Sequence, residues 1–133
     1  MGDNAVDWPA QGGMEFNFLI LAKDKWIKSN PQAVKGFMKA ILMAENFANE
    51  NADEAQNIFT RITGYEHALV GSIWDYSRFA VELPQALLIA LEDQMRWRME
   101  NKLSDIAEVP NYLNYMYFDT LNELKPEAVS MIH

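Results

Sequence analysis

The chain has 133 residues, half of them apolar, and its 19 acidic and 11 basic residues give a net charge of −8. This length predicts one domain with a real core, while the acidic balance argues against nucleic acid or an anionic membrane surface as a partner, because phosphate groups would be repelled. Cysteine is absent, which excludes a disulfide framework, a thiolate nucleophile and a cysteine-rich zinc site.

The first thirteen residues predict a loop, since Pro9 and the Gly12-Gly13 pair interrupt regular structure. They lack the basic and apolar regions of an export signal, and no run in the chain reaches the ~20 apolar residues of a membrane span. Trp8 lies in this loop near Gln11, and an aromatic ring beside amide groups is typical of small-molecule sites. Trp8 is therefore a candidate ligand contact, and the alternative is that it simply anchors the loop.

An uninterrupted apolar run of strand length extends from Phe18 to Ala22. Without polar alternation, it predicts a strand that is covered on both faces. One strand cannot make a sheet. The chain is then either an almost purely helical domain around a lone extended segment, or a piece of a larger protein that holds the other strands.

Two amphipathic helices are expected after a short helical turn over Asp24–Ser29. Asn30 as an N-cap and Pro31 at the first helical position predict the start of a long helix. Its apolar residues recur at three- and four-residue spacing, at Val34, Phe37, Met38, Ile41, Ala44 and Ala48.

A further helix is expected over Ala52–Thr63. Asn51 and Glu54 have the spacing of a capping box, in which each side chain bonds the backbone near the other. Gly64 supplies the left-handed residue that ends many helices. A shorter helix fits Glu66–Tyr76.

The pattern of the second half of the sequence predicts mainly helical structure. After residues 78–83, which suit a strand or a turn, Pro84 opens a helix whose apolar stripe contains Leu87, Leu88, Leu91, Met95, Met99 and Leu103. From Pro110 one or two short helices are expected, until Pro126 ends regular helix and residues 129–132 trail off. The predicted fold class is mainly α, with about five to seven helices and one or two short strands.

Candidate catalytic groups are few. His67, Ser72 and Asp75 are the residue types of a triad, but they lie on different parts of one helix surface without an oxyanion loop. Glu92 and Asp93 are adjacent carboxylates that diverge around a helix, so we interpret them as a solvent-facing surface. Neither a metal-ligand spacing nor a glycine-rich phosphate loop occurs. We therefore expect no enzymatic activity, no cofactor and no metal.

The segment from Phe18 to Gly64 resembles the C-terminal part of the solute-binding proteins of ABC importers for nitrate, taurine, alkanesulfonates and thiamine-precursor pyrimidines. The matching positions are Leu19, Lys23-Asp24, Trp26-Ile27, Asn30-Pro31, Val34, Phe37, Ala40, Ala44, Asn51 and Glu54-Ala55. The pieces LPQALLIALEDQ, PNYLNYMYFDTL and PEAV extend the resemblance over nearly the whole chain. These positions are helix caps and packing residues, so they identify a scaffold rather than a ligand site.

The resemblance implies descent from a two-lobed α/β periplasmic-binding-protein fold, in which the solute lies between the lobes. Residues 1–13 would be the inter-lobe crossing and residues 14–133 the helical C-terminal part of one lobe, in a periplasmic parent that delivers its solute to a membrane permease. Ligand contacts from this part would come from Trp8, Gln11, Phe16 and Asn17. A first lobe and an export signal would lie outside this chain, which would then bind solute weakly or not at all.

A piece of such a protein would leave apolar surface uncovered along Phe18–Leu21 and one side of the long helix. Exposed apolar surface promotes self-association, so we expect a homodimer or a larger species. The alternative function is a self-contained helical interaction or regulatory module, because composition and periodicity support a mainly α domain equally well.

Overall fold

The structure is a computed structural model that describes residues 17–132. Within that range the chain is mainly helical, as predicted. A single parallel bridge between Leu83 and Val129 is the β pairing of the described residues, so the one or two short strands expected from the sequence do not form there. The helices are α1 (Asp24–Ser29), α2 (Pro31–Glu50), α3 (Ala52–Thr63), α4 (His67–Trp74), α5 (Gln85–Glu100), η1 (Tyr112–Tyr115), α6 (Asp119–Leu124) and η2 (Pro126–Ala128).

Helices α2 and α3 begin where the sequence predicts, but their asparagine caps act differently. The Nδ2 atom of Asn30 donates to the carbonyl of Trp26 at 2.9 Å, and that of Asn51 donates to the carbonyl of Phe47 at 3.4 Å. Neither side chain bonds forward to the helix that follows. Each asparagine directly joins two helices, and its amide bonds back to a carbonyl in the last turn of the preceding one. The carbonyl of Phe47 also accepts the backbone N–H of Asn51 at 2.8 Å. The predicted capping box is therefore wrong.

The end of α3 follows a local signal in the sequence, whereas the bounds of α4 differ from the prediction. Gly64 has a φ of 73°, the left-handed conformation expected at the end of α3. Helix α4 is shorter than the predicted 66–76 range at both ends. The residues after it run in extended form toward α5, which begins directly after Pro84.

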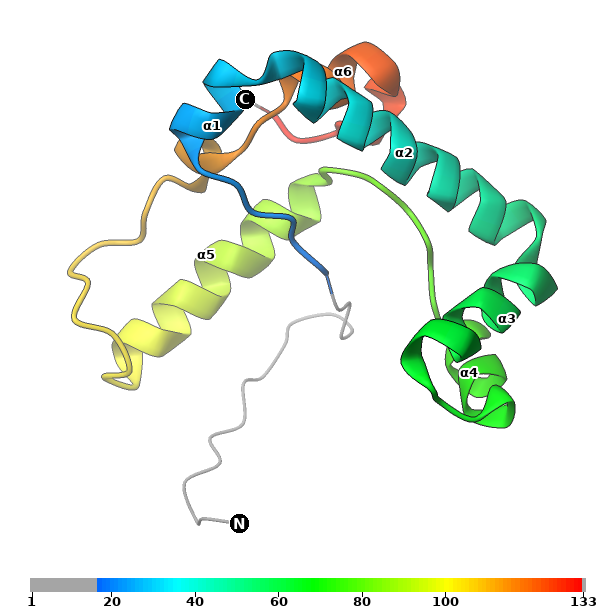
Figure 1. Cartoon of the computed structure of the whole chain (residues 1–133). Coiled ribbons are helices and arrows are strands. Elements are labelled where there is room, and N and C mark those ends of the chain that lie inside the picture. The colour runs from blue at the N-terminus through cyan, green and yellow to red at the C-terminus, as the bar shows by residue number, and fades with distance from the viewer. Residues whose placement is uncertain (1–16, 133) are drawn as a thin grey trace.

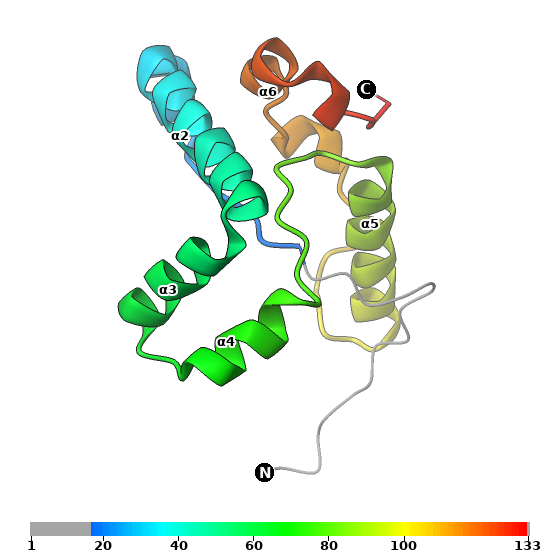
Figure 2. The same cartoon turned by 90° about the vertical axis from the view of Figure 1, so that its right-hand side faces the viewer.

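The longest helix, α2, organises the molecule (Figures 1 and 2). Helices α3 and α4 form one end, where α3 packs against both α2 and α4. Helix α6 packs against α2 and brings the C-terminal residues with it. Helix α5 lies on the other side of the molecule from α3 and α4, and residues 77–84, which follow the turn at the end of α4, connect the two sides.

The main apolar cluster lies in the C-terminal half. Leu87, Leu88 and Met131 are buried, and they are surrounded by Leu83, Leu91, Tyr112, Leu113, Met116 and Phe118. Met131 is only 3% exposed. The backbone N–H of Leu83 donates to the carbonyl of Ala128 at 2.8 Å, and the backbone N–H of Ser130 donates to the carbonyl of Leu83 at 3.2 Å. These two bonds hold the C-terminal residues beside the start of α5. The prediction that residues 129–132 trail off is therefore wrong.

The predicted helical stripe of α5 is also shorter than expected. The helix ends at Glu100, and Lys102 takes a positive φ of 56°. Leu103 consequently leaves the helix and is 47% exposed.

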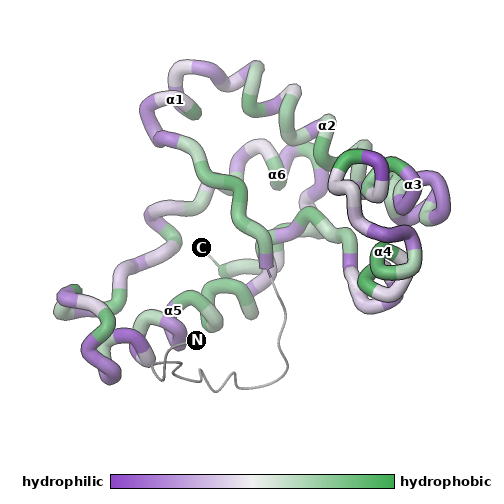
Figure 3. The backbone as a smooth tube through the Cα atoms, turned by 60° about the horizontal axis from the view of Figure 1, so that its bottom comes forward, coloured by the Kyte–Doolittle hydropathy of each residue, from purple (hydrophilic) through white to green (hydrophobic). Residues whose placement is uncertain are grey.

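The apolar run before α1 is extended but is not a strand. Phe18 is 96% exposed and Leu21 is 85% exposed, and no other described segment lies beside them as a strand. Figure 3 shows this run as a hydrophobic stretch of tube that leads into α1. The predicted burial on both faces is wrong because the described chain provides no sheet to cover it.

The apolar face predicted for α2 is also only partly covered. Val34 is buried, but Phe37 is 48% exposed. Large apolar side chains are likewise exposed on α3 and α5, for example Ile62 at 75% and Ile89 at 53%. The described residues therefore fold around a small core and leave much apolar surface open.

Candidate functional site

The four predicted ligand-binding residues are not brought together in the described part of the chain. Trp8, Gln11 and Phe16 lie outside the described residues. Asn17 is the first described residue and is exposed. The solute contacts expected at the inter-lobe crossing therefore stay a prediction.

The residues with triad chemistry are separate in the structure. The Nε2 atom of His67 lies 3.2 Å from Oδ1 of Asn57, a residue of α3. The hydroxyl of Ser72 donates to the carbonyl of Leu69 at 2.8 Å, within its own helix. The hydroxyl is thus bonded to the backbone rather than to the imidazole, and the arrangement lacks the nucleophile–base contact that a triad requires.

The adjacent carboxylates of Glu92 and Asp93 on α5 both form ion pairs with one arginine. Nη2 of Arg96 contacts Glu92 at 2.8 Å and Nη1 contacts Asp93 at 2.7 Å. The hydrogen bond with Glu92, followed by that with Asp93, raises the pKa of the Arg96 guanidinium above its ordinary value. Because both carboxylates pair with a cation at the helix surface, the structure agrees with the interpretation of this pair as a solvent-facing surface. Across residues 17–132, no group of three histidine or acidic side chains is placed to hold a metal ion.

A shallow apolar groove of about 230 Å³ lies between α2, α3 and α4. Its lining is Ala44, Phe47, Ala48, Ala55, Ile58, Phe59, Ile62, Thr63 and Trp74. Phe59 and Trp74 meet edge to face with ring centroids 6.3 Å apart, and the ring of Phe79 lies 4.3 Å from that of Trp74 at a tilt of 39°. With a single hydroxyl among apolar side chains, the groove suits apolar groups of another polypeptide better than a small anion. The i, i+4 spacing of Ile58 and Ile62 is the sequence signal for it.

A second hollow of about 340 Å³ lies where α2 meets α3. Glu50, Asn51, Ala52, Asp53 and Glu54 line it. Three carboxylates in this small area produce a negative potential, which repels an anion such as nitrate or a sulfonate. This hollow is therefore unsuited to the anionic solutes that the resemblance implies.

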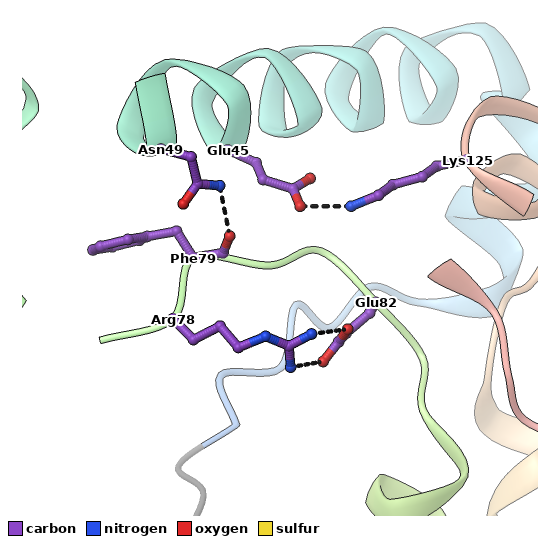
Figure 4. A network of polar contacts seen from close by, with 6 residues as sticks. All are labelled: Glu45, Asn49, Arg78, Phe79, Glu82 and Lys125. Carbon is purple, nitrogen blue, oxygen red and sulfur yellow. Dashed lines mark hydrogen bonds and ion pairs between the residues drawn. The ribbon is translucent and has the colours of Figure 1, made fainter. Parts of the chain in front are cut away.

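Polar contacts join α2 to two segments that are distant in the sequence (Figure 4). Nζ of Lys125 lies 2.5 Å from Oε1 of Glu45, whose side chain is only 9% exposed. The side chain of Asn49 donates to the carbonyl of Phe79 at 3.0 Å. Arg78 forms a two-pronged contact with Glu82 at 2.6 and 2.8 Å in the segment that leads to α5. These contacts connect partners up to 80 positions apart, so sequence reasoning missed them.

None of these places combines an enclosed cavity with convergent polar groups, which small-molecule sites usually do. Within the described residues, no helix is both long and apolar enough to cross a membrane. No protein family, curated protein or solved structure matches the chain. The family resemblance of the sequence therefore stays a prediction.

Proposed function

We propose that this chain is the C-terminal helical part of the solute-binding component of an ABC importer. In the parent protein it would help to capture a small anionic or heterocyclic solute in the periplasm for delivery to a membrane permease. The observation that carries the proposal is the exposed apolar run Phe18–Leu21, which directly precedes α1 and the Asn30-Pro31 start of α2. The strand in the family pattern has the same position, and in a complete lobe a sheet would cover it.

Apolar side chains that stay exposed on the helices support the same proposal. Large apolar side chains such as Phe37 on α2 and Ile89 on α5 stay about half exposed. Monomeric proteins rarely leave extensive apolar surface open unless another surface binds there. In the proposed parent, the rest of the lobe would cover these side chains.

The proposal assigns this part a scaffold role. Solute contacts from it would be limited to Trp8, Gln11, Phe16 and Asn17 at the inter-lobe crossing, with the remaining contacts supplied by segments outside the chain. The acidic hollow at Glu50–Glu54 and the apolar groove beside Trp74 offer no alternative place for a nitrate or sulfonate. The proposal includes no catalytic role.

Calorimetry tests the proposal. The complete protein is titrated with nitrate, taurine, an alkanesulfonate and a thiamine-precursor pyrimidine, and the same ligands are titrated into the 133-residue chain. We expect micromolar binding of one ligand class to the complete protein and none to the shorter chain. A reading frame confined to these 133 residues, without permease and ATPase genes beside it, would contradict the proposal.

The apolar groove favours a second candidate, a self-contained helical interaction module. Such modules bind an amphipathic helix by placing its apolar side chains in a groove between helices. A reading frame of 133 residues would support this candidate instead.

A further inference from the structure

The run from Phe18 to Ala22 has the properties of an unpaired strand. It is extended, and its backbone makes no hydrogen bond to another described residue. The side chains of Phe18, Leu19, Ile20 and Leu21 are 96%, 50%, 65% and 85% exposed. An extended segment with free backbone groups and apolar side chains is a template for strand addition. We propose that two copies of the chain associate by pairing this run as antiparallel strands centred on Ile20.

Each copy contributes four exposed apolar side chains to such an interface. An exposed aromatic side chain such as Phe18 offers roughly 150–250 Å², and the four side chains together offer roughly 500 Å² per copy. Pairing places these side chains beside apolar side chains of the other copy and buries part of this area, while the two faces of the ribbon keep contact with water. Pairing also satisfies backbone groups that have no described partner.

Charge and symmetry select the antiparallel arrangement. Lys23 follows the run directly, Asp24 and Lys25 then open α1, and no charged residue interrupts the run. Parallel strands in register would place Lys23 against its copy, and like charges in that position are destabilising. A closed two-fold dimer is instead antiparallel, and its lysines lie at opposite ends of the ribbon. The local positive charge therefore does not oppose pairing, despite the net charge of each chain.

The residue types select the register. A two-fold axis perpendicular to the ribbon places residues of the same face opposite each other. With the axis at Ile20, apolar residues lie opposite apolar residues throughout, and Asn17 lies opposite Lys23 at each end. With the axis at Leu19 or Leu21, one of these polar residues lies opposite a leucine. The register centred on Ile20 is the one without such a mismatch.

This dimer does not depend on the proposed transport function. It is a property of the chain with its apolar run uncovered, whatever its biological role. If the calorimetry described above detects no solute, the dimer is unaffected. If the chain is monomeric, the transport proposal is likewise unaffected.

Disulfide crosslinking tests the register, because the chain contains no cysteine of its own. In Ile20→Cys the two introduced residues lie directly opposite, with Cβ atoms about 4.5–5.5 Å apart, close to disulfide distance. The matched control is Phe18→Cys, whose two copies are offset by four residues, or about 13 Å. Under mild oxidation we expect Ile20→Cys to form a covalent dimer and Phe18→Cys to form none. Collision between monomers would favour Phe18→Cys, which is the more exposed position.

Light scattering tests the association itself. We expect the unmodified chain to show twice the 15.3 kDa mass of one copy. Ile20→Lys places two positive charges at the axis and should restore the single-chain mass, with an unchanged circular dichroism spectrum as the control for folding. A single-chain mass for the unmodified protein at all concentrations would overturn the proposal. Equal crosslinking of the two cysteine variants would overturn the register and the ordered pairing with it.

Discussion

Lys125 Nζ lies 2.5 Å from Oε1 of Glu45 and so connects the end of α6 to the middle of α2 across 80 positions of the chain. The Glu45 side chain is 9% exposed and the Lys125 side chain is 25% exposed. The second oxygen of Glu45 is buried and has no hydrogen-bond partner among the described residues. An ion pair in this environment fixes the position of α6, and removal of one partner leaves a buried charge.

We expect Lys125→Met to lower the free energy of unfolding by about 2–3 kcal/mol, a value below the full loss for a buried pair because Lys125 keeps some contact with water. Urea unfolding followed by circular dichroism measures it. The double variant Glu45→Met with Lys125→Met should lose less unfolding free energy than the two single variants lose together, because it leaves no unpaired charge.

The matched control for this prediction is Lys35→Met. Lys35 pairs with Glu123 between the same two helices, but these side chains are 31% and 57% exposed. A pair in contact with water contributes about 0–1 kcal/mol. A loss in Lys35→Met as large as that in Lys125→Met would contradict the role assigned to burial.

Gly64 and Gly36 should respond to alanine in opposite directions. Gly64 has a φ of 73°, where a side chain is strained, so Gly64→Ala should destabilise the protein by about 1–2 kcal/mol. Gly36 lies inside α2, and a Cβ atom there meets nothing within 4 Å. Gly36→Ala should therefore stabilise it by about 0.5–1 kcal/mol. Thermal unfolding of both variants checks the signs, and a loss of stability in Gly36→Ala would contradict the open position of this residue.

Neighbouring C-terminal residues should differ sharply in their effect on stability. Met131 is 3% exposed beside Leu87 and Leu88, whereas Ile132 is 81% exposed. Truncation of a buried methionine costs about 2–5 kcal/mol, and we expect Met131→Ala to lie near the lower value. Ile132→Ala should change the unfolding free energy by less than about 0.5 kcal/mol. Equal effects in urea unfolding would show that these residues do not pack as described.

Alanine variants at two asparagines of α2 separate the contribution of a long-range hydrogen bond to stability from that of helix propensity. The amide of Asn49 donates to Phe79 at 3.0 Å, whereas Asn46 is exposed on the same helix. Both alanine variants gain the same propensity, but only Asn49→Ala loses the bond to the extended segment. We expect Asn49→Ala to be less stable than Asn46→Ala by about 1 kcal/mol. Identical unfolding midpoints would indicate that this bond contributes nothing.

Local signals in the sequence were enough to place most helices. The Asn30-Pro31 pair, Gly64 and Pro84 each act within a few residues of themselves, and the helix boundaries follow them closely. What these signals did not provide was the direction of the side-chain bonds, since Asn30 satisfies the helix before it. Both directions are compatible with the same residue at a junction of two helices.

Contacts between distant segments were not predictable in this way. Nothing near Met131 in the sequence indicates that it reaches Leu87, and nothing near Glu45 indicates Lys125. The predicted strand Phe18–Ala22 failed for the related reason that burial depends on what lies beside a segment. Of the predicted ligand residues, only Asn17 lies in the described part of the chain. The groove beside Trp74 was not predicted, because three helices must meet before that surface exists.

The bridge between Leu83 and Val129 has a consequence for the order in which the molecule folds. Contacts among α2, α3 and α4 join neighbours along the chain, whereas the bridge must bring together positions 46 residues apart, with the associated loss of chain entropy. Local contacts generally form faster than distant ones. We therefore expect the α2–α4 end to become structured first and the half that contains α5 to close later, when the two ends of its long loop meet.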